Sequence, residues 1–178
     1  MKNIKYILFV AILLFVIFPG EGTPKGVIRP ISQFTQLPAN SVSITLMEQA
    51  MEQANINFQD VLNREGVRSI LIPSDEAFTA FLENLGDDYT AIADFDRQGE
   101  LDVLHEIISY HIVLGELRVA AADYSLMTLQ GEPMIGLPGE LKRVTNVGGH
   151  YASVVQEMDN IGHLSIVVID KVLLPPSY

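Results

Sequence analysis

The stretch SILIPSDEAF, at residues 69–78, decides the fold of this chain. It starts with the apolar run Ile70–Ile72, which is typical of a buried β-strand. Pro73 lacks a backbone N–H donor, so it should end that strand. Ser74 is then a candidate N-cap of a helix, and two acidic residues follow in the first turn, where the helix dipole favours negative charge.

The residues after this turn repeat at helical spacing. Phe78, Phe81, Leu82 and Leu85 fall at positions i, i+3, i+4 and i+7, which form one face of a helix. Gly86 follows, and a glycine commonly ends a helix at this place because it tolerates a left-handed backbone. The segment therefore predicts a buried strand that turns sharply into a capped amphipathic helix. The rest of the chain is expected to cover it.

These motifs resemble the signatures of the fasciclin domain family. The opening stretch is similar to its first signature, an apolar strand that runs into a Pro-Thr/Ser-x-x-Ala-Phe turn. Three more stretches resemble the family in the right order: YHIVLG at 110–115, its central Tyr-His segment; MTLQGE at 127–132, its Thr-Leu-x-Gly hairpin; and VIDKVLLPP at 168–176, its closing signature. The resemblance implies an α+β, fasciclin-like fold. It would be a wedge of β-strands with helices packed alongside, in which the closing strand lies near Ile70.

Helical patterns dominate the first half of the chain and strand patterns the second. Capping-box spacing at Thr45 predicts a short helix to about Ala54, and Asn57 is a candidate cap of another helical turn. An apolar helical face that starts near Leu101 is expected to end at Gly115. Two hairpins and a buried β-branched strand are predicted at residues 126–137, 141–155 and 164–169. This order independently indicates an α+β layout.

The N-terminus carries the pattern of an export signal. Two lysines precede the apolar run Tyr6–Phe18, and GEG at residues 20–22 offers a small-x-small cleavage pattern. The run is shorter than the roughly 20 residues of a spanning helix, so a cleaved signal peptide at residues 1–22 is favoured over an uncleaved anchor. Residues 23–40 are expected to form a linker or N-terminal arm, and residues 41–178 the fasciclin-like domain. The protein is then predicted to be secreted, periplasmic or on the cell surface.

The composition bounds the function further. Apolar residues make up 48% of the chain and charged residues 19%, which is typical of an ordered globular protein. The formal net charge of −11 argues against binding to nucleic acid or to an anionic membrane surface. The chain has no cysteine, which excludes disulfides, thiolate metal sites and a cysteine nucleophile.

Tyr110 and His111 are the candidate binding residues. The resemblance implies this role, because the Tyr-His segment has been linked to cell-surface receptor binding in animal members of the family. The alternative is a histidine fixed by hydrogen bonds in the core, with the tyrosine ring packed beside it.

The signature residues Pro73, Ser74, Asp75, Phe78 and Asp170 are expected to have structural roles. Asp75 should stabilise the start of its own helix, and Asp170 should hydrogen-bond to the backbone at an irregularity in a strand.

The acidic segment at residues 87–99 admits two interpretations. It could supply oxygen ligands to a cation, but its spacing does not match the calcium loop D-x-[DN]-x-[DN]-G. A solvated acidic surface with helix caps is favoured. The four histidines show no metal-binding spacing, so no metal site and no cofactor is predicted.

Asp102, His105 and Ser109 share one helix face and imitate a hydrolase triad in residue type. A triad needs its serine at an exposed turn with backbone donors aimed at an oxyanion, and a serine within a helix has no such donors. No G-x-S-x-G motif is present. We therefore predict a non-enzymatic module of adhesion or surface and matrix interaction that binds a cell-surface protein or polysaccharide. The alternative is an envelope protein that binds a small ligand or a cation.

Overall fold

The computed structural model describes Ile31 and residues 42–117, 124–137, 143–146 and 150–178. The predicted signal peptide and almost all of the predicted linker lie outside the described residues. Among the described residues, no helix is long and apolar enough to cross a membrane.

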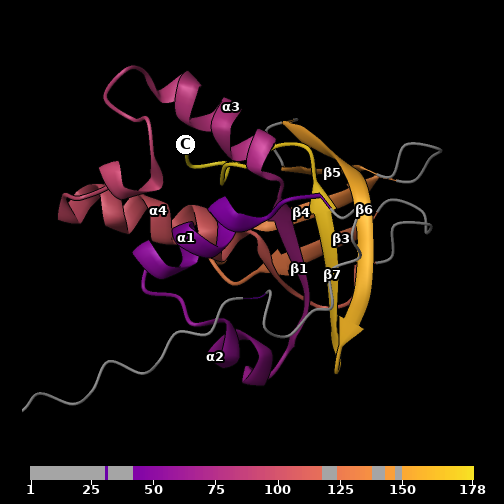
Figure 1. Ribbon diagram of the computed structural model, residues 1–178. Helices are drawn as coiled ribbons and strands as arrows, with labels where there is room; N and C mark the ends of the chain where they lie inside the picture. The colour runs from indigo at the N-terminus through magenta and orange to yellow at the C-terminus, as the bar shows by residue number, and fades with distance from the viewer. Residues whose placement is uncertain (1–30, 32–41, 118–123, 138–142, 147–149) are drawn as a thin grey trace, which may run out of the picture.

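The helices all lie in the first part of the described chain, with β1 between α2 and α3, and the strands β2–β7 follow them, which confirms the α+β fold class (Figure 1). The helices are α1 (Thr45–Gln53), α2 (Phe58–Asn63), α3 (Asp75–Leu85), the short 3₁₀ turn η2 (Ile92–Asp94) and α4 (Gln98–Tyr110). The strands are β1 (Val67–Pro73), β2 (Ile112–Leu114), β3 (Tyr124–Thr128), β4 (Pro133–Leu137), β5 (Arg143–Asn146), β6 (Tyr151–Ile161) and β7 (Leu164–Ile169). Both predicted hairpins are present, as β3–β4 and β5–β6.

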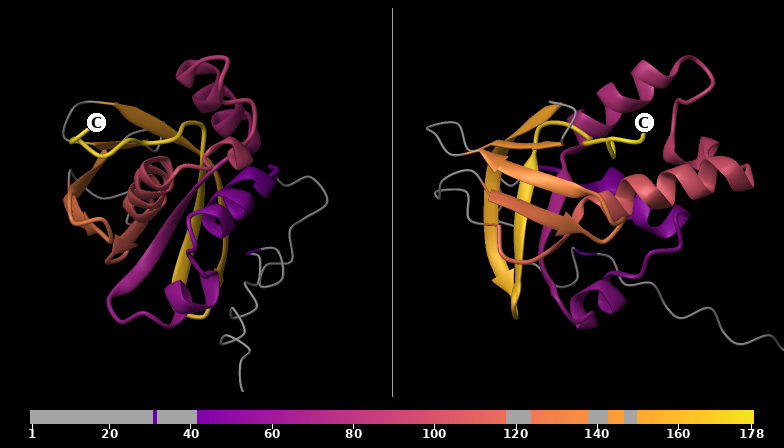
Figure 2. Two further views of the ribbon diagram at one scale, coloured as in Figure 1. Left: turned by 90° about the vertical axis from the view of Figure 1, so that its left-hand side faces the viewer. Right: turned by 180° about the vertical axis from the view of Figure 1, so that it is seen from behind.

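The strand β1 holds the sheet together. It pairs with β2 in antiparallel register and with β7 in parallel register, so that Ile70 lies opposite Ile112 on one side and Ile166 on the other. The remaining pairs are antiparallel, and the seven strands close on themselves. The closing strand therefore lies beside Ile70, as the resemblance implies. Figure 2 shows the helices to one side of this closed sheet and the end of α4 entering it.

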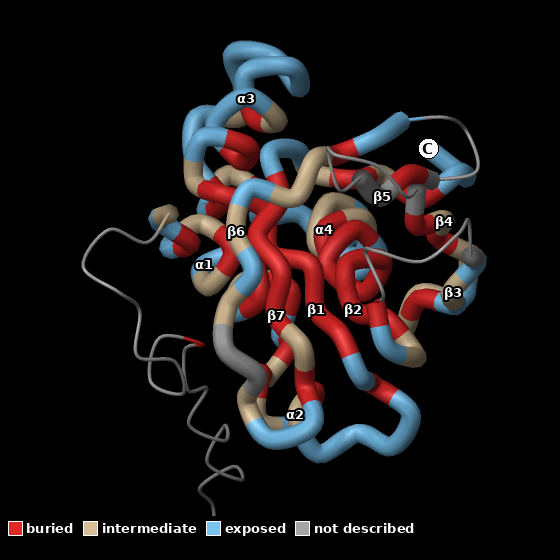
Figure 3. Tube along the Cα trace, turned by 90° about the vertical axis from the view of Figure 1, so that its right-hand side faces the viewer, coloured by how far each residue is buried: buried red, intermediate tan, exposed pale blue. Residues whose placement is uncertain are grey.

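The two faces of the sheet bury two clusters of side chains. Ile70 and Ile72 of β1 face the cluster beneath α1, α3 and α4, whereas Leu71 faces the second cluster, together with Tyr110. β7 alternates in the same way, with Ile166 on the helix side. Because both faces are buried there, the Ile70–Pro73 part of β1 and the Ile166–Ile169 part of β7 are continuously apolar (Figure 3).

The strand-to-helix turn is built as its sequence predicts. β1 ends at Pro73, and the Ser74 hydroxyl accepts a hydrogen bond from Ala77 N at 3.2 Å at the start of α3. Ser74 N also donates to Ile169 O, at 3.0 Å, which ties the turn to β7. Phe78 is fully buried under the sheet.

Asp75 lies in the first turn of α3, as predicted, and it has a second role that the sequence does not predict. Its carboxylate does not cap α3 but accepts hydrogen bonds from Leu46 N, at 2.7 Å, and from the Ser43 hydroxyl. The prediction that Thr45 opens a capping box at the start of α1 is wrong. The N-cap of α1 is Ile44, whose apolar side chain offers no acceptor, so a carboxylate from a distant part of the chain supplies it.

The predicted end of α4 is also wrong. The apolar face was expected to continue as helix to Gly115, but α4 ends at Tyr110 and Ile112–Leu114 forms β2. Ile112 and Val113 are β-branched and fully buried, and they pair with β1 and β3. Pairing in the sheet outweighs the local helical pattern.

Candidate binding cleft

Tyr110 is fully buried at the end of α4. Its hydroxyl donates a hydrogen bond to Pro133 O at 3.0 Å, which fixes α4 to the start of β4. Burial raises the pKa of the Tyr110 hydroxyl to about 12, so it remains a donor at any physiological pH.

His111 is also fully buried, and the protein satisfies both of its ring nitrogens. Nδ1 lies 2.8 Å from Ile107 O and therefore carries the proton, while Nε2 accepts a hydrogen bond from Leu173 N at 3.1 Å. Burial lowers the pKa of the imidazole to about 4, which keeps it neutral. His111 thus joins the end of α4 to the segment that follows β7.

These contacts place Tyr110 and His111 in the core, as the structural alternative expects. Neither side chain reaches the surface, so a partner could touch them only if the segment left the core. A binding role for Tyr110 and His111 stays a prediction. A surface site has to be sought elsewhere.

Asp170 lies where β6 changes register against β7, between Val154 and Gln156. Its Oδ1 accepts a hydrogen bond from Ser153 N at 2.7 Å, and its own N–H donates to Ser153 O at 3.1 Å. This is the backbone-bonding role at a strand irregularity that the sequence predicts.

Asp94 in the acidic segment after α3, and Glu100 just beyond it, accept hydrogen bonds from nearby backbone N–H groups. Asp94 accepts hydrogen bonds from Thr90 N and Ala91 N, each at 2.7 Å, and these bonds lower the pKa of its carboxyl group. Glu100 accepts from Arg97 N at 3.2 Å at the start of α4. Within the described ranges, no three His, Asp or Glu side chains are grouped so as to hold a metal ion.

Of the three residues that imitate a triad, Asp102 and His105 are hydrogen-bonded to groups outside it. Asp102 accepts a hydrogen bond from the Gln98 side chain at 2.8 Å, and His105 Nδ1 lies 3.0 Å from Ala54 O. Among the described side chains, no hydrogen bond links Asp102, His105 and Ser109. The arrangement therefore lacks the relay from acid to base to nucleophile that hydrolysis would need.

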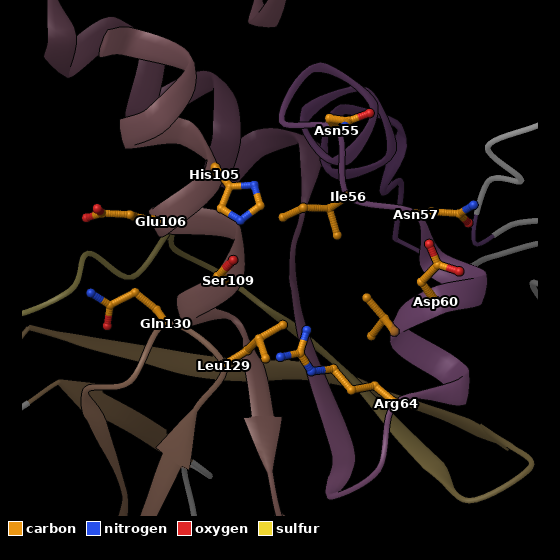
Figure 4. A pocket seen from close by; sticks show the side chains of 11 residues that line it. Asn55, Ile56, Asn57, Asp60, Arg64, His105, Glu106, Ser109, Leu129 and Gln130 are labelled. Atoms are coloured by element: carbon orange, nitrogen blue, oxygen red, sulfur yellow. The ribbon is translucent and has the colours of Figure 1, made fainter. Parts of the chain in front are cut away.

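His105 and Ser109 instead line an open cleft between α2, α4 and the β3–β4 turn (Figure 4). Its volume is about 410 Å³. The floor is apolar, with Ile56 and Val61 buried and Leu129 half-buried. The remaining lining residues are polar or charged: Asn55, Asn57, Asp60, Arg64, His105, Glu106, Ser109 and Gln130.

Ser109 is the deepest polar group of this cleft. Only 5% of its surface is exposed, and its hydroxyl makes no hydrogen bond to any described residue. Figure 4 shows the hydroxyl directed into the cleft on the side of His105. A buried hydroxyl without a partner costs about 1–3 kcal/mol, so this group needs water or a ligand in the cleft.

Arg64 and Asp60 extend the polar lining from α2. Both are exposed, and neither forms an ion pair with a described residue. Asp60 carries two carboxylate acceptors, and Arg64 carries a planar set of donors. The cleft therefore presents uncommitted donors and acceptors above an apolar floor, which is the usual composition of a ligand site.

The comparisons with known proteins agree with this architecture. The family model of the fasciclin domain matches residues 42–175. This chain belongs to the fasciclin domain family. Among solved structures, the chain is similar to a FAS1 domain pair from the insect cell adhesion molecule Fasciclin I, at 20% sequence identity and a TM-score of 0.57. The match covers 76% of this chain and 46% of that one, so the fasciclin domain described here spans about half of its neighbour. No curated protein matches the chain.

Sequence reasoning singled out two of the cleft residues of this fasciclin domain, but for another chemistry. The sequence indicates His105 and Ser109 as parts of an apparent triad and Gln130 only as part of a hairpin, whereas it gives no signal for Asn55, Asp60 or Arg64. The cleft combines residues 55–64, 105–109 and 129–130, which only the folded chain brings together. The helical spacing of His105 and Ser109 was the one signal that the sequence offered.

Proposed function

We propose that this fasciclin domain is an extracellular, non-enzymatic adhesion module that binds a polysaccharide or a protein of a cell surface. The observation that carries the proposal is the open cleft whose deepest polar group, the Ser109 hydroxyl, is left without a partner among the described residues. Family membership supports an adhesive role, because the similar FAS1 domain pair comes from a cell adhesion molecule.

The cleft, and not the Tyr110–His111 segment, is the contact site in this proposal. Tyr110 and His111 support α4 from the inside, and α4 carries His105 and Ser109 into the cleft. A cleft of about 410 Å³ gives modest affinity for one ligand unit. Firm adhesion would then come from several domains acting on one surface, since multivalent binding multiplies weak contacts.

The proposal is tested by adding the protein to cell envelopes and measuring bound protein at equilibrium. We expect saturable binding that falls in a Ser109→Ala/Arg64→Ala double variant. The matched control is Ser125→Ala/Arg68→Ala, which changes the same residue types at exposed positions outside the cleft. Loss of binding in both double variants, or retention in both, would rule out the cleft as the contact site. No saturable binding at all would contradict the adhesive function.

A second candidate function is the capture of a free small ligand in the same cleft. The same unpaired polar groups support it. The two functions differ in whether the ligand is fixed to a surface or free in solution. Adhesion requires a ligand fixed to a surface, whereas a small-ligand protein would be saturated by low-molecular-weight extract and would then show a raised unfolding midpoint.

A further inference from the structure

We propose that the cleft holds one neutral sugar ring of a polysaccharide, an inference that rests on the adhesive function proposed above. It assigns the ligand class and the residues that bind it.

The first argument is the balance of donors and acceptors. Asp60 offers acceptors only and Arg64 donors only, while the Ser109 hydroxyl can do both. A sugar hydroxyl also donates and accepts, so it can pair with each of these three kinds of group. Planar carboxylate and guanidinium groups each reach two neighbouring hydroxyls, which matches the vicinal hydroxyls of a hexose.

His105 adds a further hydrogen-bonding group to the cleft. Its Nδ1–H is directed at Ala54 O, 3.0 Å away, which leaves Nε2 free of that contact, and Nε2 is a hydrogen-bond acceptor in the neutral form of the ring. A ligand near His105 therefore has to donate a hydrogen bond, and a ligand near Ser109 has to fill the place of a missing partner. A hydroxylated ligand does both, whereas a purely accepting ligand such as an inorganic anion does not.

The apolar floor of the cleft also suits a sugar ring. Ile56 and Val61 are buried and Leu129 is half-buried, and together they form the apolar side of an otherwise polar cleft. A pyranose has a C–H face opposite to its hydroxyl-bearing edge. Such a ring can rest its C–H face on these side chains and remove apolar surface from water on both sides of the contact.

Charge favours a neutral sugar over an acidic one. Asp60 and Glu106 both line the cleft, against the single cation Arg64. The whole chain carries a formal net charge of −11. An acidic polysaccharide would approach against this field, and a neutral one would not.

The form of the cleft favours a sugar over a peptide. Peptides commonly add a strand to an open sheet edge or lay an apolar helix face into a groove. The seven strands of this sheet close on themselves, and the cleft has only three apolar lining residues. Its volume of about 410 Å³ lies near the lower end of ligand sites, which suits one ring better than a folded helix.

The test is a titration of the ¹⁵N-labelled protein with the methyl pyranosides of glucose, galactose and mannose, followed by amide chemical shifts. We expect at least one of the three to shift amides of the cleft residues with a dissociation constant in the millimolar range. Sodium galacturonate and the tripeptide Ala-Glu-Ala are the acidic sugar and acidic peptide controls. Stronger binding of either control than of every neutral hexoside would overturn the neutral-sugar assignment.

Two single variants test whether the sugar ring lies against Ser109 and Arg64. Ser109→Ala and Arg64→Ala should each weaken binding of the best hexoside by roughly three- to tenfold, since each removes a hydrogen-bonding group. Ser125→Ala and Arg68→Ala should leave the affinity unchanged. Equal affinity in all four variants, or amide shifts confined to residues outside the cleft, would contradict the proposal.

The outcome separates this inference from the proposed function. If the protein binds envelopes in a cleft-dependent way but no hexoside shifts the cleft amides, the sugar assignment fails and the adhesive function stands. If hexosides bind but envelopes do not, the sugar site stands and adhesion fails.

Discussion

The core around His111 and the cleft at Ser109 both adjoin the C-terminal half of α4, but they differ in whether their buried polar groups are hydrogen-bonded. Inside the closed sheet, both ring nitrogens of His111 are bonded, and the Ser69 hydroxyl donates to Gly115 O at 3.1 Å and accepts from Leu117 N at 2.8 Å. In the cleft, two residues before His111, Ser109 is also buried, but its hydroxyl has no partner among the described residues. Satisfied polar groups stabilise the fold, whereas the Ser109 hydroxyl is available to water or to the ligand proposed above.

The largest effect is expected from His111→Ala. The change opens a cavity and leaves Leu173 N without its acceptor, so the free energy of unfolding should fall by about 3–5 kcal/mol. Urea unfolding followed by circular dichroism measures it. A loss below about 1 kcal/mol would show that the segment after β7 does not depend on His111.

The second largest effect is expected in the dependence of the free energy of unfolding on pH. The folded pKa of His111 is about 4, below the ordinary value of 6.5, so the unfolded chain takes up the proton first as the pH falls. The stabilisation by neutral His111 is complete above about pH 6.5 and is lost toward pH 4, by roughly 3 kcal/mol in all. Unfolding free energies across this range should show a smaller slope in His111→Gln. A variant of the exposed His163 should keep the slope, and an unchanged slope in His111→Gln would contradict this assignment.

The two buried serines should then respond differently to alanine. Ser69→Ala removes the acceptor of Leu117 N and should lower the free energy of unfolding by about 1–3 kcal/mol. Ser109→Ala removes a hydroxyl that only water in the open cleft can satisfy in the free protein, so it should change the free energy of unfolding by less than about 0.5 kcal/mol in either direction. If the same urea titration gave equal losses of unfolding free energy in the two variants, the difference between a bonded and an unbonded buried serine would be contradicted.

Asp75→Ala should have an effect of about 1–2 kcal/mol, because it removes the acceptor at the start of α1. Glu76→Ala is the matched control, since Glu76 is an exposed acid of the same turn. Thermal unfolding compares the two. A larger loss from Glu76→Ala would show that the helix dipole of α3, and not the contact to α1, is what matters.

The parts of the fold that the sequence predicted depend on local signals. The turn from β1 into α3 could be predicted because Pro73, Ser74 and the apolar periodicity act within a few residues of one another. The β3–β4 and β5–β6 hairpins have the same local origin. The pairing of β7 with β1 is long-range, and only the family resemblance implied it.

The errors and the missed contacts fall where distant parts of the chain meet. Asp75 bonds to the start of α1, about thirty positions earlier in the chain, and no spacing rule reports such a contact. Ile112 continues the helical pattern of α4 but pairs with β1 instead. The cleft could not be predicted for the same reason, because its three segments meet only after α2 and α4 are placed against the β3–β4 turn.

The most direct test of the account is to measure, side by side, the stability of Ser109→Ala/Arg64→Ala and its binding to cell envelopes. We predict wild-type stability with lost envelope binding, while the control double variant Ser125→Ala/Arg68→Ala keeps both. Full envelope binding by the stable cleft variant would contradict the claim that the unsatisfied polar groups of this cleft form the contact site.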